Sequence, residues 1–241
     1  MTSLSRRHHR ARMVRDALHA AVVEGVWVGA LPHEDELGRQ FGVGRNVVRE
    51  ALRLLVEEGL LVRQQGWGTR PTTSVLMHAM HRLQSLHEDA GLTTSSRDIQ
   101  HRVVRWDLIP ASPLHAAALG VATGETVVHY ERLTSSLTPL IFWSTVMRSD
   151  VGLRPPAPVG GCSALGFYAY LERSGLTLGQ ESVRTSAVRA DQGVAELLDV
   201  EPGSPLLVQH RRLLMADGRP LEVSTGYLRP DQVALTHDIS R

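Results

Sequence analysis

An internal repeat is the feature that most constrains the fold of this chain of 241 residues. Residues 112–132 align with residues 191–211 at an offset of 79, and the match resumes, after two extra residues, with Pro139-Leu140 over Pro220-Leu221. Each copy contains a helix-capping residue, a short apolar segment, a turn with glycine and two β-prone runs. Two such units predict an α+β domain with a largely antiparallel sheet and internal pseudo-twofold symmetry. Equivalent positions would then face a shared crevice, where ligand clefts often lie.

The first 70 residues carry a different pattern, with apolar side chains at helical spacing over residues 11–26, 34–41 and 45–58. Gly42 separates the second and third segments and can adopt the left-handed conformation that ends a helix. Two short helices joined by a glycine-containing turn are typical of a helix-turn-helix. A β-prone run and a glycine-rich turn follow over residues 60–70, and they predict a basic hairpin, or wing.

Side chains suited to reading DNA bases lie on one flank of the third predicted helix. Arg45, Arg49 and Arg53 follow one another at four-residue steps, so they share this flank, and Asn46 lies beside them. Arginine can donate two hydrogen bonds to guanine, and asparagine can pair in both directions with adenine. A wing after such a helix usually contacts the DNA backbone or the minor groove. The alternative is a solvated helix face on which Arg49 or Arg53 pairs with a nearby acid such as Glu50.

The charges are unevenly distributed, although 26 arginines, no lysines and 25 acidic residues give a formal net charge of only +1. Residues 1–70 hold 11 arginines and 8 acids, whereas residues 71–241 hold 15 arginines and 17 acids. The first part is therefore basic, which suits a polyanion as a partner, and the second part is slightly acidic.

Composition and motifs disfavour several classes of protein. The single cysteine, Cys162, cannot form an intrachain disulfide or a cysteine-based zinc site. No apolar run approaches the length of a membrane-spanning helix, so we expect a cytoplasmic protein without a membrane partner. The histidines at positions 78, 81 and 87 lack a plausible ligand set at close spacing, so no metal or cofactor is expected. The chain has no nucleophile elbow, zinc-protease motif or phosphate loop, which argues against an enzyme.

A long ordered motif in the first part resembles a known family of DNA-binding proteins. Residues 31–37, 41–52, 58–60 and 65–69 are similar to the winged helix-turn-helix of the GntR family of bacterial transcription regulators. The resemblance covers about residues 10–71 and implies that Arg45 and Arg49 contact DNA and that Gly66 lies at the wing tip. Together with the flank and the hairpin, it gives a predicted DNA-contacting set of Arg45, Asn46, Arg49, Arg53, Gln65, Gly66, Trp67 and Thr69.

The motif also departs from the family at positions that commonly contact DNA. His33 stands where the family usually has serine, and Asp35 stands where an arginine is common. Gly44, Val47 and Trp67 replace a serine, a threonine and an arginine. The apolar positions and glycines are intact, so the resemblance carries the fold but not the operator sequence of other members.

The second part, from about Leu83 to Val233, resembles the UTRA effector-binding domain, which together with a GntR head defines the HutC-like subfamily. In that family the residues matching Arg132, Tyr168 and Glu222 line the ligand pocket. With neighbouring motif positions, the predicted effector-binding residues are Arg132, Trp143, Tyr168, Glu222 and Arg229. The alternative is structural, with Arg132 paired to Glu131 or Glu222 and Tyr168 in the core.

Three departures in this part bear on the effector. Thr134 stands in place of a frequent second arginine, Trp143 in place of glutamate, and Gly166 in place of a serine that often binds phosphate or sugar. Their loss weakens any inference to an amino-sugar phosphate. The aromatic residues Phe142, Trp143 and Phe167 favour a less charged, more apolar molecule, and the alternative is that they belong to the core.

We therefore expect an α+β protein with an N-terminal winged helix-turn-helix (residues 1–71), a linker (72–82) and a C-terminal mixed or antiparallel-sheet UTRA domain of chorismate lyase-like fold (83–241). The predicted function is that of a repressor that binds a palindromic operator in double-stranded DNA as a homodimer, under control of a small-molecule effector. Two alternatives remain at this point. One is a constitutive architectural DNA-binding dimer without effector, and the other is an enzyme of chorismate lyase-like fold.

Overall fold

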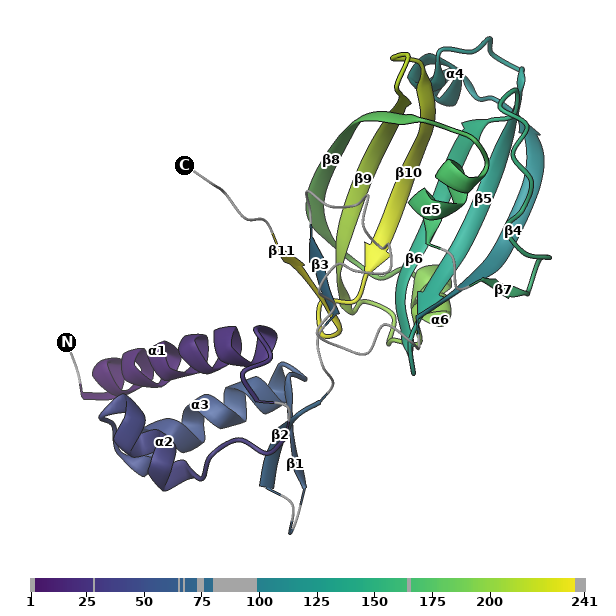
Figure 1. Cartoon of the computed structure of the whole chain (residues 1–241). Coiled ribbons are helices and arrows are strands. Elements are labelled where there is room, and N and C mark those ends of the chain that lie inside the picture. Colours follow the sequence, from purple (N-terminus) through teal and green to yellow (C-terminus); the bar gives the residue numbers. More distant parts are fainter. Residues whose placement is uncertain are drawn as a thin grey trace. The chain divides into compact units, whose positions relative to one another are not determined.

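The computed structural model describes residues 3–27, 29–64, 66, 68–72, 76–79, 99–163 and 166–236 (Figure 1). The chain divides into two compact units, one drawn from Met1–His78 and Asp231–Thr236 and the other from Ala79–Pro230. The predicted linker at residues 72–82 lies largely outside the described residues. None of the described helices is long and apolar enough to cross a membrane.

The first unit contains the predicted helices and wing, namely α1 (Ser3–Val23), α2 (Glu34–Phe41), α3 (Arg45–Glu57), β1 (Leu61–Gln64) and β2 (Gly68–Pro71). Helix α1 begins eight residues before the predicted start at Ala11. Helix α2 ends at Gly42, which adopts the expected left-handed conformation with φ of 61°. The apolar stripes of the three helices meet in one core, which includes Val14, Leu18, Leu37, Val48, Leu52 and Leu55.

A second two-stranded sheet includes a strand from near the C-terminal end of the described residues, which belongs to this first unit. Strand β3 (Leu76–Ala79) pairs with β11 (Val233–Thr236), and Ala234 packs against the helical core. The sequence from Met77 to Glu88 is compatible with a helix, but the structure has a strand as far as Ala79, and the rest of this segment lies outside the described residues. The chain thus joins the two units twice, once after β3 and once before β11.

The second unit is built on a seven-stranded antiparallel sheet in the order β7-β4-β5-β6-β10-β9-β8. Its strands and helices are β4 (Gln100–Pro110), α4 (Pro113–Leu119), β5 (Thr126–Ser135), β6 (Pro139–Arg148), β7 (Cys162–Ser163), α5 (Phe167–Arg173), β8 (Leu178–Arg189), α6 (Gln192–Leu198), β9 (Pro205–Met215) and β10 (Pro220–Leu228). The sequence repeat explains this order, because β4-β5-β6 and β8-β9-β10 are equivalent triplets that meet at β6 and β10. Ser144 faces Thr225, its own repeat equivalent, so the pseudo-twofold axis passes between these two residues.

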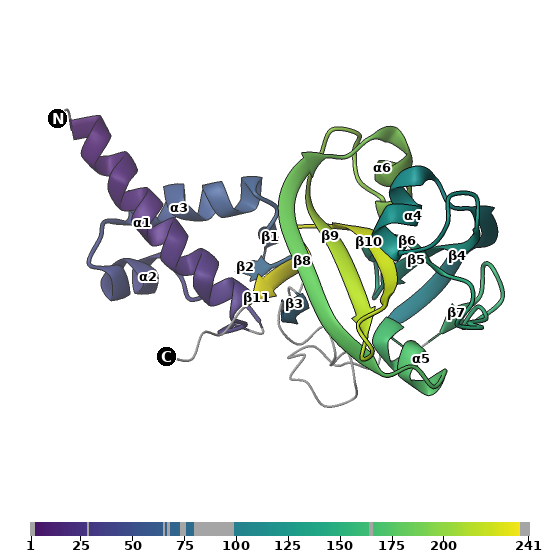
Figure 2. The same ribbon diagram turned by 90° about the horizontal axis from the view of Figure 1, so that it is seen from above.

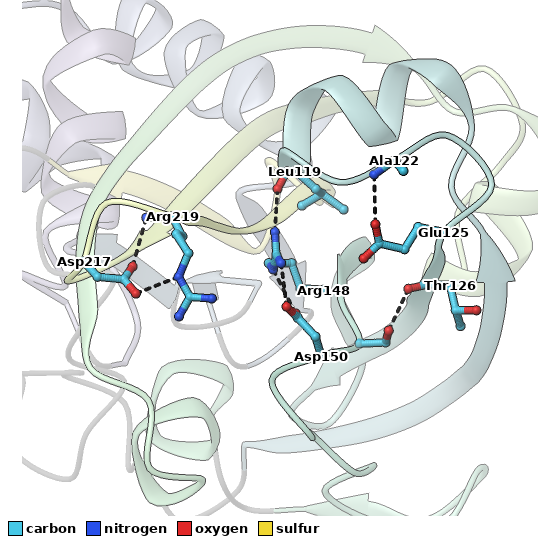
Figure 3. Close-up of polar contacts among 9 residues, drawn as sticks. Leu119, Ala122, Glu125, Thr126, Arg148, Asp150, Asp217 and Arg219 are labelled. Atoms are coloured by element: carbon cyan, nitrogen blue, oxygen red, sulfur yellow. Dashed lines mark hydrogen bonds and ion pairs between the residues drawn. The ribbon is translucent and has the colours of Figure 1, made fainter.

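The two repeat helices are held at both ends by equivalent residues. Ser112 accepts a hydrogen bond from the third backbone N–H of α4 (3.2 Å), and Asp191 accepts the corresponding bond in α6 (2.9 Å). Arg148 donates from Nη1 to the Leu119 carbonyl at the end of α4 (3.1 Å) and pairs with Asp150, as Figure 3 shows. Arginine at a helix C-terminus satisfies carbonyls that have no partner within the helix.

The helices divide between the two faces of the sheet (Figure 2). Helices α4 and α6 cover one face, where they pack on residues such as Val127, Val146 and Phe142. Helix α5 packs on the opposite face against Val128, Tyr130 and Met147, among others. Because side chains alternate along a strand, the face under α5 also receives Arg132 from β5 and Arg211 from β9.

Candidate DNA-binding and effector-binding sites

Two of the predicted DNA-reading arginines of α3 are exposed and share one acidic partner. The side chains of Arg45 and Arg49 are 59% and 52% exposed, and both contact Oε2 of Glu34, at 3.1 and 3.2 Å. Asn46 is exposed beside them. Arg45 and Arg49 line a groove of about 990 Å³ between α3, the start of α2 and the wing.

The wing contributes its own residues to this groove. Arg63 reaches Glu34 from β1 at 3.4 Å, and Thr69 lies opposite Arg63 on β2. Gly66 has φ of 80°, a conformation that favours glycine at a tight hairpin tip. The predicted contacts Gln65 and Trp67 lie outside the described residues.

Arg53 differs from the other two arginines of α3. It pairs with Glu50 and Glu57 on its own helix, as in the alternative of a solvated helix face. These hydrogen bonds raise the pKa of Arg53 above its ordinary value. Arg49 instead contacts Glu34 on another helix, as Arg45 does, so the three arginines form two separate groups.

In the second unit, four of the five predicted effector-binding residues meet on the face of the sheet under α5. Arg132, Trp143, Tyr168 and Glu222 are each at most 4% exposed, and they surround a second buried arginine, Arg211. We call these five residues together with Phe167 the buried arginine cluster.

Arg132 lies among aromatic rings, and within the described part of the chain it shares Glu222 only through a longer-range charge interaction and not through a close ion pair. Its guanidinium carbon is 4.2 Å from the centre of the Phe167 ring and 5.3 Å from that of Trp143. It donates a long hydrogen bond, 3.5 Å from Nη1 to the hydroxyl of Thr145. Glu131 pairs with Arg105, so neither structural alternative for Arg132 is found among the described residues. Burial, together with the charge of Arg211, lowers the pKa of Arg132 to about 10.

Arg211, in contrast, is closely paired. Its Nε donates to Oε1 of Glu222 at 2.6 Å and lies 3.5 Å from Glu181, and its Nη1 donates to the Tyr168 hydroxyl at 3.0 Å. Tyr168 in turn donates to Glu181. Burial acts to lower the pKa of Arg211, but Glu222 and these neighbours outweigh it and raise that pKa. Burial also raises the pKa values of Tyr168 and Glu181.

Several polar atoms of this region are buried without a hydrogen-bond partner among the described residues. They are Nη2 of Arg211, Oε2 of Glu222 and both amide atoms of Gln209. Such groups normally find a partner in protein, water or ligand, because an unsatisfied one costs on the order of 1–3 kcal/mol. Two buried guanidinium groups beside one fully buried carboxylate can therefore receive an anionic group together with a hydrogen-bond donor.

Trp143 can lie in the cluster because the neighbouring strand β10 has a glycine opposite it. It faces Gly226 across the β6–β10 pair, and a Cβ atom at Gly226 would lie 2.7 Å from the Trp143 ring. Only glycine leaves room for the indole ring to lie over the centre of the sheet. The departure at position 143 thus places an aromatic surface where many similar proteins have a carboxylate.

Comparison with known proteins decides the family. A model of the UTRA domain matches residues 94–234, and a model of the gntR family of bacterial regulatory proteins matches residues 10–70. The chain belongs to the GntR family of transcription regulators and carries a UTRA domain. Its HutC-like organisation and its α+β fold class are thereby confirmed.

Individual relatives span nearly the whole of this GntR regulator. The transcriptional repressor NagR of Bacillus subtilis is 27% identical, over 88% of this chain and 86% of NagR. The histidine utilization repressor of Pseudomonas aeruginosa is 28% identical, over 83% of this chain and 79% of the relative. The crystal structure of PhnF from Mycobacterium smegmatis superposes with a TM-score of 0.62 at 22% identity, over 94% and 99% of the two chains, and supports the fold. The family is one of transcription regulators, which removes the enzyme alternative.

The regulator has one candidate site residue that sequence reasoning missed. Arg211 is the repeat equivalent of Arg132, since both end the aligned segments at the offset of 79. Two equivalent strands that flank a pseudo-twofold axis bring both arginines to the centre of the same face. The repeat itself was therefore the signal that could have identified Arg211.

The fifth predicted effector residue, Arg229, lies apart from the cluster. It follows the end of β10, seven residues after Glu222, which corresponds to roughly 20 Å along a strand. Its Nη1 donates to the Leu198 carbonyl at the end of α6 (3.2 Å). Arg229 thus contacts α6 as its repeat equivalent Arg148 contacts α4.

The sheet also carries a hollow of about 450 Å³, lined by Ser144, Arg184, His210, Arg212 and Thr225 among others. Arg211 of the cluster is one of its lining residues, but none of the five predicted effector residues lines it. Three of the buried unpaired atoms belong to Arg211 and to Gln209 on the same strand, and the fourth belongs to Glu222. The buried arginine cluster is therefore the better candidate for an effector site.

Proposed function

We propose that this GntR regulator is a repressor that binds a palindromic operator as a homodimer and releases it when a small anionic effector binds the buried arginine cluster. The NagR and histidine utilization relatives are both named repressors, which supports the sign of the regulation. A symmetric dimer would present two reading heads to two half-sites, spaced by about one helical turn, 10 to 10.5 bp, or as the dimer geometry sets it.

In the proposed DNA complex, Arg45, Asn46 and Arg49 enter the major groove, and the wing follows the backbone or the minor groove. The support is that the three side chains are exposed on one flank of α3, beside a groove that the wing completes. Their chemistry suits guanine and adenine edges.

The observation that carries the effector proposal is the unequal neutralisation of the two buried arginines. Arg211 has Glu222 at 2.6 Å, whereas Arg132 forms no close ion pair with a carboxylate of the described residues. A buried charge without a counter-ion is costly, and an anionic ligand supplies one. A carboxylate or phosphate group would bind at Arg132, and a hydroxyl or amine of the same molecule would donate to Oε2 of Glu222.

The rest of the buried arginine cluster favours a ligand with an apolar or aromatic body. Trp143 and Phe167 provide ring surfaces next to both guanidinium groups. The sequence departures had favoured a less charged effector, and the two expectations meet in a molecule with one anionic group on an apolar frame. The effector can relieve repression only through a difference in its affinity for the DNA-competent and DNA-incompetent states.

A thermal-shift screen tests this proposal on the full chain. The panel contains aromatic and aliphatic carboxylates and phosphate monoesters, each beside its neutral methyl ester or amide. A true effector at 100 times its dissociation constant adds roughly 2.7 kcal/mol of stability, and its neutral analogue should add little. Hits should also release the duplex that the protein enriches from a random-sequence library.

The matched variants are Arg132→Met and Arg105→Met. The first removes the unneutralised buried cation, and the second removes an arginine that is 53% exposed on the other face. We expect Arg132→Met to bind DNA normally and to lose the response to anions, whereas Arg105→Met keeps both. If no anion stabilises the wild type or releases DNA, the protein is a constitutive DNA-binding dimer and the effector proposal is wrong.

A further inference from the structure

One carboxylate joins all three elements of the proposed DNA-reading surface. Glu34, the first residue of α2, binds Arg45 and Arg49 of α3 through Oε2 and Arg63 of the wing through Oε1. Its side chain is only 21% exposed, whereas those of the three arginines are 45% to 59% exposed. Glu34 thus lies beneath a layer of guanidinium groups.

Glu34 is ionised in this position. Burial works against its charge, but the hydrogen bonds from Arg45 and Arg49 outweigh burial and lower the pKa of Glu34 below its ordinary value. A carboxylate that binds several guanidinium groups at once restricts long side chains that would otherwise sample many rotamers.

The atoms used in these contacts leave the reading edges available. Arg45 binds Glu34 through Nε at 3.1 Å, so both of its Nη groups remain for an acceptor pair such as O6 and N7 of guanine. Arg49 uses Nε and Nη2, at 3.4 and 3.2 Å, and keeps Nη1. The carboxylate therefore orients these side chains without occupying every donor.

We propose that Glu34 is a positioning residue for base readout, which holds Arg45 and Arg49 in a pre-formed arrangement and so sets the discrimination between operator and other DNA. This inference rests on the proposed role of Arg45 and Arg49 in reading DNA. Pre-organised side chains lose less entropy when they bind, and this gain applies only where the bases match the arrangement.

A purely electrostatic role for Glu34 makes the opposite prediction. Removal of a negative charge from a DNA-binding surface strengthens binding to any DNA, because phosphate attraction is independent of sequence. The ratio of operator to non-operator affinity separates the two roles, because positioning changes the affinity for the operator alone.

The experiment compares Glu34→Gln with Glu36→Gln in the full chain. Both changes remove one carboxylate from the first turn of α2, but Glu36 contacts Arg39 and Gln40 of its own helix rather than the described residues of α3 or the wing. Affinity is measured for the duplex that the wild type enriches from a random library and for a scrambled duplex of the same composition. We expect Glu34→Gln to lower the ratio about tenfold without weakening binding to the scrambled duplex, and Glu36→Gln to leave the ratio unchanged.

Glu34→Asp keeps the charge but shortens the side chain by one methylene, so it should lower the ratio by a smaller factor. It also keeps the test valid if Glu34→Gln does not fold, as judged by circular dichroism. Equal ratios for the wild type and the Glu34 variants, or a higher ratio in Glu34→Gln, would overturn the inference. A wild-type protein that enriches no duplex would instead overturn the proposed DNA-reading function itself.

Discussion

The two halves of the UTRA domain keep the same scaffold but differ at its centre. The equivalent helices α4 and α6 are capped by Ser112 and Asp191. At the centre, Arg211 has the carboxylate of Glu222, whereas the position equivalent to Glu222 in the first half, at the offset of 81, is Ile141. The halves therefore differ at the proposed effector site and are alike at the caps of the two helices.

This divergence turns a structural symmetry into chemical asymmetry. An ancestral pair of equal halves would have two arginines with equal partners. Here one guanidinium is neutralised, and the other, that of Arg132, is surrounded by rings and lacks a carboxylate partner among the described residues. An anionic ligand should therefore gain the most binding free energy next to Arg132, in the first half.

The largest expected effect comes from breaking the neutralised half. Glu222→Gln leaves the buried Arg211 without its closest counter-ion, and loss of one partner of a buried ion pair costs about 3–5 kcal/mol. We expect the free energy of unfolding to fall by about that amount in chemical denaturation of the full chain.

The matched control for this prediction is Glu131→Gln. Glu131 pairs with Arg105, whose side chain is 53% exposed, so its removal should cost less than about 1 kcal/mol. Similar losses for the two variants would show that Glu222 does not act as the counter-ion of a buried arginine.

The sequence predicted much of this domain because local patterns specify local structure. The repeat predicted α4 and α6 and the strands after them, and the resemblance singled out Arg132, Tyr168 and Glu222. The register could not be predicted. A bulge between Pro220 and Glu222 allows the neighbours Leu221 and Glu222 both to be fully buried, and strict alternation would have put one of them on the other face.

The pairing of strands far apart in the chain also could not be predicted from the sequence. Strand β3 pairs with β11, about 150 residues later, and no local pattern links Leu76 to Val233. The role of Arg229 was limited in the same way. Its contact with the end of α6 depends on how β10 lies against that helix, whereas its position in the motif of the resemblance suggested a ligand.

An intermediate effect on the free energy of unfolding should come from a histidine whose pKa is influenced by Arg132. His101 is buried, and Nδ1 lies 3.0 Å from the hydroxyl of Thr134. Burial and the charge of Arg132 lower the pKa of His101 from 6.5 to about 4. As pH falls below 6.5, the unfolded chain therefore takes up a proton before the folded chain does. The free energy of unfolding should decline by about 3 kcal/mol from this residue between pH 7 and pH 4.

Denaturation at a series of pH values checks this expectation in the wild type and in His101→Gln. The variant should lack this part of the decline, whereas His210→Gln, at an exposed position, should keep it. Parallel pH profiles for the wild type and His101→Gln would rule out His101 as the group responsible.

The smallest expected effects compare the two halves where they are most alike. Arg148→Met and Arg229→Met each remove an arginine that donates to the last carbonyl of a repeat helix, at 3.1 and 3.2 Å. Each change should lower the free energy of unfolding by about 1 kcal/mol, the usual contribution of one hydrogen bond. Equal losses with an unchanged effector response would assign both residues to the scaffold. The other outcome is that Arg229→Met alone abolishes the response to an anion that still stabilises Arg148→Met. The two halves would then differ at this position as well. Such a result would support the sequence-based assignment of Arg229 to the effector site over a role limited to its contact with α6.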